Sequence, residues 1–138
     1  MGARAVADII FDLGSKASLA VYVVWIEMLP ADNLDEAHRQ AGHMLSPWIA
    51  HFHDPGKMAG KAIAETLGAE DRVAWDFYLT YRPGDRWGET PPRPQAWTHQ
   101  LAGAVWANPF RYRTGEALKR ELSKMISTCI AKASMRSD

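Results

Sequence analysis

Two histidines and an aspartate stand close together in the segment "WIAHFHD" and could hold a metal ion. His51 and His53 are two residues apart, so on a strand their side chains point to the same face, and Asp54 adds a carboxylate. A zinc site needs a third and usually a fourth ligand, and the remaining candidates are His43, His99 and Asp76. Because Asp54 directly precedes Pro55, it is expected above all to cap a helix. No metal is therefore assigned, and these residues are kept as weak candidates.

A second set of side chains could bind a ligand at the end of a predicted sheet, where α/β folds place their sites. Asp76 and His99 could approach one another there and form a carboxylate–imidazole pair, although such residues are more often structural. No nucleophile accompanies them, so no catalytic residue is assigned. Tryptophans near prolines could wall a pocket for a flat or apolar molecule, namely Trp87, Trp97 and Trp106. The candidates for ligand binding are Trp75, Asp76, Trp97 and His99.

The single cysteine, Cys129, excludes a dithiol within this chain. It lies on an apolar stripe with Met125, Ile126 and Ile130, where a buried thiol behaves as a small apolar side chain. An inert role is the main interpretation, and a reactive thiol that works with a partner's thiol is the alternative. No cofactor is expected.

Composition narrows the classes of partner. The 138 residues fit one domain, and 16 basic and 16 acidic side chains cancel, so neither nucleic acid nor a membrane surface is predicted as a partner. The longest apolar run, "LAVYVVWI", is far shorter than the about 20 residues of a membrane span. No signal peptide is recognisable, so a cytoplasmic location is expected.

The first half of the chain alternates helices and strands. Apolar spacing predicts a helix over residues 3–13, and residues 19–29 read as a central strand covered on both faces. Asn33, three residues before Glu36, predicts the start of a second helix. A short strand is expected within "WIAHFHD", followed by a helix that starts at Asp54-Pro55 and is closed by Gly68.

The second half is predicted to hold a hairpin and further helices. Residues 73–81 alternate as a strand, Pro83-Gly84 suits a type II turn, and "DRWGE" is the expected partner strand. A short helix through Trp97 and Leu101 follows the proline-rich loop, and Thr114 can cap an amphipathic helix within 113–134. The order predicts one α/β domain over residues 1–138, a sheet with helices on both faces.

Several segments together resemble the thioredoxin superfamily, in its peroxiredoxin-like arrangement and more narrowly in a bacterial branch. The segments that carry the resemblance are "VYVVWIEMLPADN", "HFHDPGK", "AWDFYLTYRPGDRWG" and "WTHQL". The resemblance spans about residues 2–101. It implies a mixed sheet flanked by helices, with the amphipathic helix as a C-terminal addition.

The chain departs from this family at the residues that carry its chemistry. The resemblance implies a central strand and a Cys-x-x-Cys motif at the start of "GARAVADIIFDL", and neither is found there. The proline expected in cis before the hairpin strand is replaced by about Trp75 or Asp76. A truncated, redox-inactive domain is therefore expected.

The lost strand must be compensated, because open strand edges leave backbone groups unpaired. Three compensations are considered: direct pairing of 19–29 with 73–81, a strand from a partner chain, or cover by the last helix. Direct pairing is preferred, with the last helix repacked. A homodimer is also predicted, because the apolar stripe from Leu118 to Ile130 needs a surface to bury against.

Three functions follow, and the first is preferred. The first is a non-catalytic binding or assembly module, with a small molecule or a protein as ligand. The second is a metal- or ligand-binding protein or hydrolytic enzyme, and its residues are His51, His53, Asp54, Asp76 and His99. The third is a redox accessory protein that uses Cys129. Whether the protein is an enzyme is left open, with the balance against it.

Overall fold

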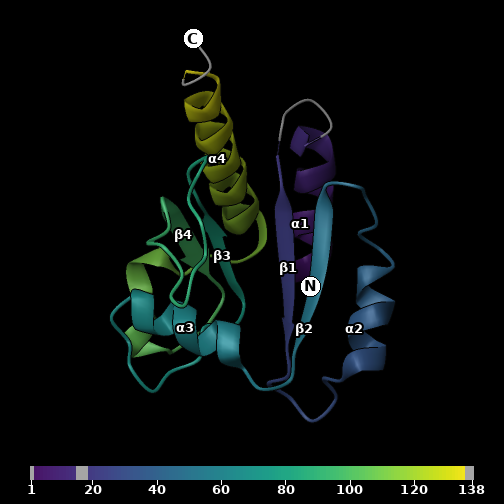
Figure 1. The fold of residues 1–138 in the computed structure, drawn as a ribbon, viewed down its shortest axis with the longest axis vertical. Helices are drawn as coiled ribbons and strands as arrows, with labels where there is room; N and C mark the ends of the chain where they lie inside the picture. The colour runs from purple at the N-terminus through teal and green to yellow at the C-terminus, as the bar shows by residue number, and fades with distance from the viewer. Residues whose placement is uncertain (1, 15–18, 136–138) are drawn as a thin grey trace.

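The computed structural model describes residues 2–14 and 19–135, and it confirms an α/β fold. The elements in chain order are α1 (Gly2–Gly14), β1 (Val21–Ile26), α2 (Leu34–Ala41), β2 (Ile49–Asp54), α3 (Met58–Thr66), β3 (Phe77–Thr80), β4 (Ala96–His99), the short 3-10 helices η1 (Val105–Ala107) and η2 (Pro109–Arg111), and α4 (Gly115–Ser134). The strands form two separate pairs, β1 with β2 and β3 with β4 (Figure 1). Among the described residues there is thus no single continuous sheet.

The β1–β2 pair is parallel, and α2 lies in the connection between its strands. Val21 lies opposite Ile49 and Ile26 opposite Asp54. The Asn33 side chain accepts a 2.9 Å hydrogen bond from the Glu36 N–H, so the predicted cap of α2 is confirmed. The core behind the pair includes Ile10 of α1 and Met44, which follows α2. Both are buried, and they cover one face of the strands.

The β3–β4 pair is an antiparallel hairpin with a different partner strand from the one predicted. Gly84 has φ +89°, as a type II turn after Pro83 requires. The partner of β3 is nevertheless Ala96–His99 and not residues 85–89, and the predicted helix through Trp97 is wrong for the same reason. Asp85 instead closes the turn, because its carboxylate accepts a 2.9 Å hydrogen bond from the Arg82 N–H.

Two local conformations moved element boundaries from their predicted places. Asp76 has φ +54°, which ends the extended backbone, so β3 starts at Phe77 and not near residue 73. Helix α3 starts at Met58 and not at Pro55, because Lys57 adopts a left-handed φ of +59°. Asp54 still caps the helix, since its carboxylate accepts hydrogen bonds of 2.9 and 2.8 Å from the N–H groups of Met58 and Ala59.

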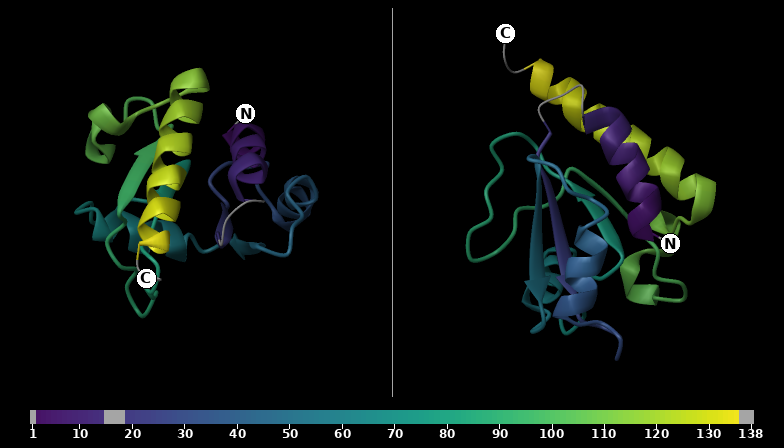
Figure 2. Two further views of the ribbon diagram at one scale, coloured as in Figure 1. Left: turned by 90° about the horizontal axis from the view of Figure 1, so that it is seen from above. Right: turned by 90° about the vertical axis from the view of Figure 1, so that its right-hand side faces the viewer.

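Helix α4 joins the two halves of the molecule. It packs beside α1 and also contacts β3 and β4 (Figure 2). The predicted apolar stripe is buried within the chain, at Leu118, Leu122, Met125 and Ile126. The surface that led to the homodimer prediction is therefore already covered by the chain itself.

Direct pairing of β1 with β3, the preferred compensation for the strand that the resemblance implies, is wrong. Strands β1 and β3 are not paired with each other, and no described strand lies between them. Helix α4 instead spans both pairs. No helix within 2–14 or 19–135 is long and apolar enough to cross a membrane.

Candidate functional site

His51 and His53 share one face of β2, but their ring nitrogens already have partners. The His51 Nδ1 accepts a 3.2 Å hydrogen bond from the Trp25 indole, and its Nε2 lies 3.1 Å from the Met44 carbonyl oxygen. This pattern fits the tautomer with the hydrogen on Nε2. The two partners hold the imidazole of His51 as part of the packing between β1, β2 and the segment after α2.

His53 and Asp54 are also engaged within the chain. The His53 Nε2 lies 2.7 Å from the Glu27 carboxylate, and Asp54 caps α3 as described above. The described part of the chain gathers no three His, Cys, Asp or Glu side chains in a geometry suited to a metal ion. His51, His53 and Asp54 therefore act as structural groups in this arrangement.

His99 is a fully buried core residue. Its Nδ1 accepts a 3.1 Å hydrogen bond from the Leu101 N–H, and its Nε2 lies 3.1 Å from the Asn108 carbonyl oxygen. The ring also stacks on Phe77, with centroids 5.2 Å apart. Because both nitrogens are occupied, the expected hydrogen bond between Asp76 and His99 is not formed.

The remaining ligand candidates are divided between two cavities. Trp75 lines a cavity of about 490 Å³ with Met28, Leu101 and Trp106, at the end of the molecule where β1 finishes and the segment before β3 begins. Asp76 adjoins this region, and desolvation raises the pKa of its carboxyl. Its carbonyl oxygen accepts a 3.0 Å hydrogen bond from the Gln100 N–H.

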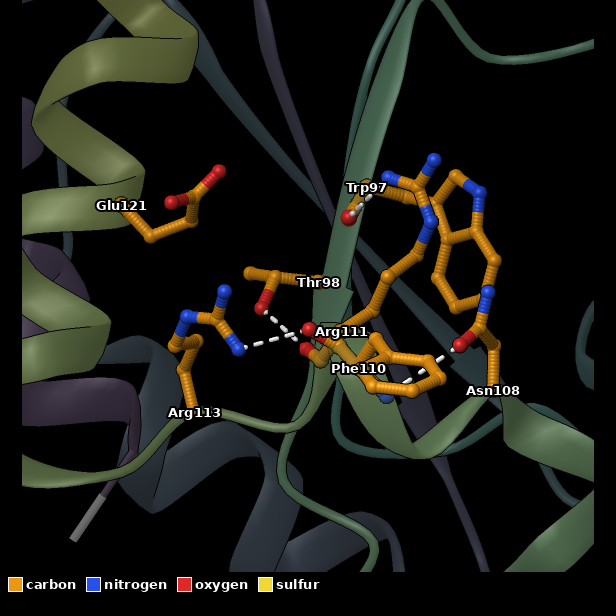
Figure 3. A pocket seen from close by; sticks show the side chains of 7 residues that line it. All are labelled: Trp97, Thr98, Asn108, Phe110, Arg111, Arg113 and Glu121. Atoms are coloured by element: carbon orange, nitrogen blue, oxygen red, sulfur yellow. Dashed lines mark hydrogen bonds between the residues drawn. The ribbon is translucent and has the colours of Figure 1, made fainter.

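Trp97 lines a different cavity, of about 300 Å³, beside β4 (Figure 3). The guanidinium carbon of Arg111 lies 4.6 Å from the centroid of the Trp97 ring, and Nη1 of Arg111 donates to the Trp97 carbonyl at 3.1 Å. Arg113 donates to the carbonyl groups of Phe110 and Tyr112, both at 2.8 Å. Arg111 thus fastens residues 108–113 to β4, and Arg113 holds the segment together internally. Because Trp75 and Trp97 line different cavities, the predicted four-residue ligand site is not assembled in one place.

Cys129 lacks the surroundings of a reactive thiol. Its Sγ donates a 3.2 Å hydrogen bond to the Tyr81 carbonyl, and desolvation raises the pKa of the thiol. A raised pKa lowers the thiolate fraction, and the thiolate is the nucleophile in thiol exchange.

The edge of β1 that faces away from β2 has no strand partner among the described residues, and neither has the outer edge of β2. Val21 N–H donates to Trp48 at 2.9 Å and Glu27 N–H donates to Asp54 at 3.4 Å, so the odd-numbered residues of β1 direct their backbone groups to β2. The N–H and C=O groups of Tyr22, Val24 and Ile26 consequently point away from β2. No described segment pairs with them.

The edge of β3 is open in the same way. The Gln100 N–H donates to the Asp76 carbonyl, and in the antiparallel register Tyr78 directs its backbone groups to Thr98. The backbone groups of Phe77 and Leu79 therefore face away from β4. The far edge of β4 is covered, since the His99 carbonyl accepts a 2.9 Å hydrogen bond from Arg113 N–H.

Helices α3 and α4 tie the two open edges to one frame. At one end, a Cβ on Gly60 of α3 would lie 3.0 Å from the side chain of Ile26 and 2.6 Å from that of Val73, so α3 closely joins the end of β1 to the segment before β3. At the other end, Cys129 of α4 bonds Tyr81 after β3, and Ile130 packs in the cluster that includes Val21. The unpaired edge of β1 and the unpaired edge of β3 together form what we call the strand site.

Sequence reasoning recognised the strands of this site but not its openness. The uncharged sequence of β1 predicts a strand whose two faces are both covered. The same sequence pattern fits a strand with an unpaired edge, because side-chain types report burial of the faces and not pairing of the backbone. The small number of strands in the sequence could have indicated the open edges. A strand from a partner chain was one of the three compensations considered for such edges.

Comparison of the chain with protein-family models, with curated proteins and with solved structures gave no match.

Proposed function

We propose that this protein is a non-catalytic, thioredoxin-like module that binds or assembles with polypeptides through the strand site. The observation that carries the proposal is the pair of open edges on β1 and β3, held in one frame by α3 and α4. Unpaired backbone groups of a strand edge are a template for another strand. A proposal of polypeptide binding therefore uses a feature that internal packing leaves unexplained.

The proposal is non-catalytic because the side chains that could carry chemistry are engaged elsewhere. His51 and His99 each use both ring nitrogens in hydrogen bonds within the chain. Cys129 donates to a carbonyl and has a raised pKa. The proposal includes the cytoplasm as the location, and a homodimer as one form of assembly that the open edges would allow.

Selection from a library of random 12-residue peptides, displayed on phage, tests the proposal. Wild-type protein should enrich apolar peptides that a Val24→Pro variant does not retain. That variant removes one N–H from the open edge of β1 and leaves the hydrogen bonds to β2 in place. Peptides enriched equally by both proteins, or none at all, would refute polypeptide binding at the strand site.

A second candidate is binding of a small apolar molecule in the cavity of about 490 Å³ beside Trp75 and Trp106. Its volume lies within the range of small-molecule sites, and aromatic walls suit a flat ligand. Indole, titrated to millimolar concentration, should give a saturable heat of binding by isothermal titration calorimetry with wild-type protein and not with a Trp75→Leu variant. Trp87→Leu, at an exposed site outside this cavity, is the matched control.

A further inference from the structure

We infer that the strand site accepts one extended, uncharged segment of a partner polypeptide, inserted as a strand between β1 and β3. This inference rests on the proposed function and specifies its ligand.

The two open edges run in opposite directions. Met28, just after β1, and Trp75, just before β3, line the same cavity, so the end of β1 lies near the start of β3. One inserted strand would therefore run parallel to one neighbour and antiparallel to the other. Both ladders would be satisfied together: Tyr22, Val24 and Ile26 on one side, and Phe77 and Leu79 on the other.

The side chains around the site are apolar on both faces of the sheet. On one face, Val21 and Val23 pack with α1 and with Ile126 of α4. On the other face, Phe77 and Leu79 pack against the buried Ile63 of α3. An inserted strand would alternate between these two faces, so both of its alternating sets of side chains would be apolar.

Charge and length define the partner segment further. Neither "VYVVWI" of β1 nor "FYLT" of β3 contains a charged residue, so a charge on the inserted segment would meet no opposite charge on either edge. The strands are six and four residues long. The fitting partner is thus an uncharged, β-branched or aromatic stretch of about five residues, the length of an ordinary strand.

Amide hydrogen exchange measured by NMR tests the inference at single residues. The probe is a synthetic peptide with a six-residue core of valine and isoleucine, flanked by lysines for solubility. At saturation, the amides of Tyr22, Val24 and Phe77 should exchange at least about tenfold more slowly, as expected when strand-edge amides enter a ladder. The amides of Val21 and Val23, already directed to β2, are the internal control and should change little.

Two matched peptides separate edge pairing from general stickiness. A peptide with two central residues changed to lysine should fail to protect any of these amides. A peptide with N-methyl groups on alternate residues, which blocks one edge, should protect β1 or β3 and not both. Equal protection by all three peptides would overturn insertion as a strand.

The outcomes distinguish this inference from the proposed function. Peptide binding without protection at Tyr22, Val24 and Phe77 overturns the strand insertion and leaves polypeptide binding intact. If protection of these amides rises with protein concentration in the absence of peptide, a second copy of this chain occupies the strand site. That result would also overturn the inference that a segment of a different polypeptide is inserted there. If neither this peptide nor the displayed library binds, the proposed function falls with it.

Discussion

Replacing His99 by phenylalanine should destabilise the protein, because the imidazole ring of His99 is hydrogen-bonded through both nitrogens as well as stacked on Phe77. Phenylalanine keeps a ring beside Phe77 but removes the acceptor for the Leu101 N–H and the donor to the Asn108 carbonyl. The buried Leu101 N–H costs about 1 to 3 kcal/mol when it is left without a partner. Asn108 is exposed, so its carbonyl can bond water instead, and the more apolar phenylalanine ring offsets part of the loss.

Urea denaturation, followed by tryptophan fluorescence, measures this change. We expect the free energy of unfolding of His99→Phe to fall by about 1 to 3 kcal/mol. His43→Phe is the matched control, because His43 is exposed, and surface changes of this kind usually stay within about 0.5 kcal/mol. A loss below about 1 kcal/mol for His99→Phe would show that the two hydrogen bonds contribute little. The structural role assigned to the imidazole would then be wrong.

Four further predictions test the frame around the strand site. Gly60→Ala should lower the free energy of unfolding by about 1 to 3 kcal/mol, because its Cβ would lie 2.6 Å from the nearest side-chain carbon. Gly88→Ala is the control, since a Cβ there meets open space. Equal free energies of unfolding for the two variants in urea denaturation would contradict the close approach of α3. Asp54→Ala should cost about 1 kcal/mol through loss of the α3 cap, and an unchanged midpoint in thermal unfolding would refute it. Cys129 should react with iodoacetamide at pH 8.5 several times more slowly than glutathione, as its raised pKa requires, and an equal or faster rate would exclude the inert reading. Burial raises the pKa of Tyr81 to about 12, so the folded state holds its proton more tightly than the unfolded state; stability should therefore fall between about pH 10 and 12, and Tyr81→Phe should flatten that fall.

The elements with strong local signals could be predicted from the sequence. The cap by Asn33, the turn at Pro83-Gly84, the helix end at Gly68 and the last amphipathic helix all lie where their residue types indicated. Each depends on neighbours in the chain, which a sequence displays directly. The class of fold followed from their order.

The errors concern features decided by distant contacts. The positive φ of Asp76 and the pairing of Ala96–His99 with β3 depend on the surrounding tertiary structure, which local propensity does not report. His99 looked like a partner for Asp76 because both lie near one end of the hairpin. Its two nitrogens are instead taken by Leu101 and by Asn108, which follows nine residues later.

The exposed aromatic pair on the β1–β2 strands bears on the tendency of the protein to aggregate. Tyr22 and Phe52 lie with ring centroids 6.2 Å apart and are 69% and 52% exposed, on strands without lysine or proline. Natural proteins usually guard edge strands with lysine or proline, and unguarded apolar strands are prone to align into fibrils. If the proposed strand site is left unfilled, the protein should therefore be prone to aggregation, and its cellular abundance should follow the supply of the partner segment.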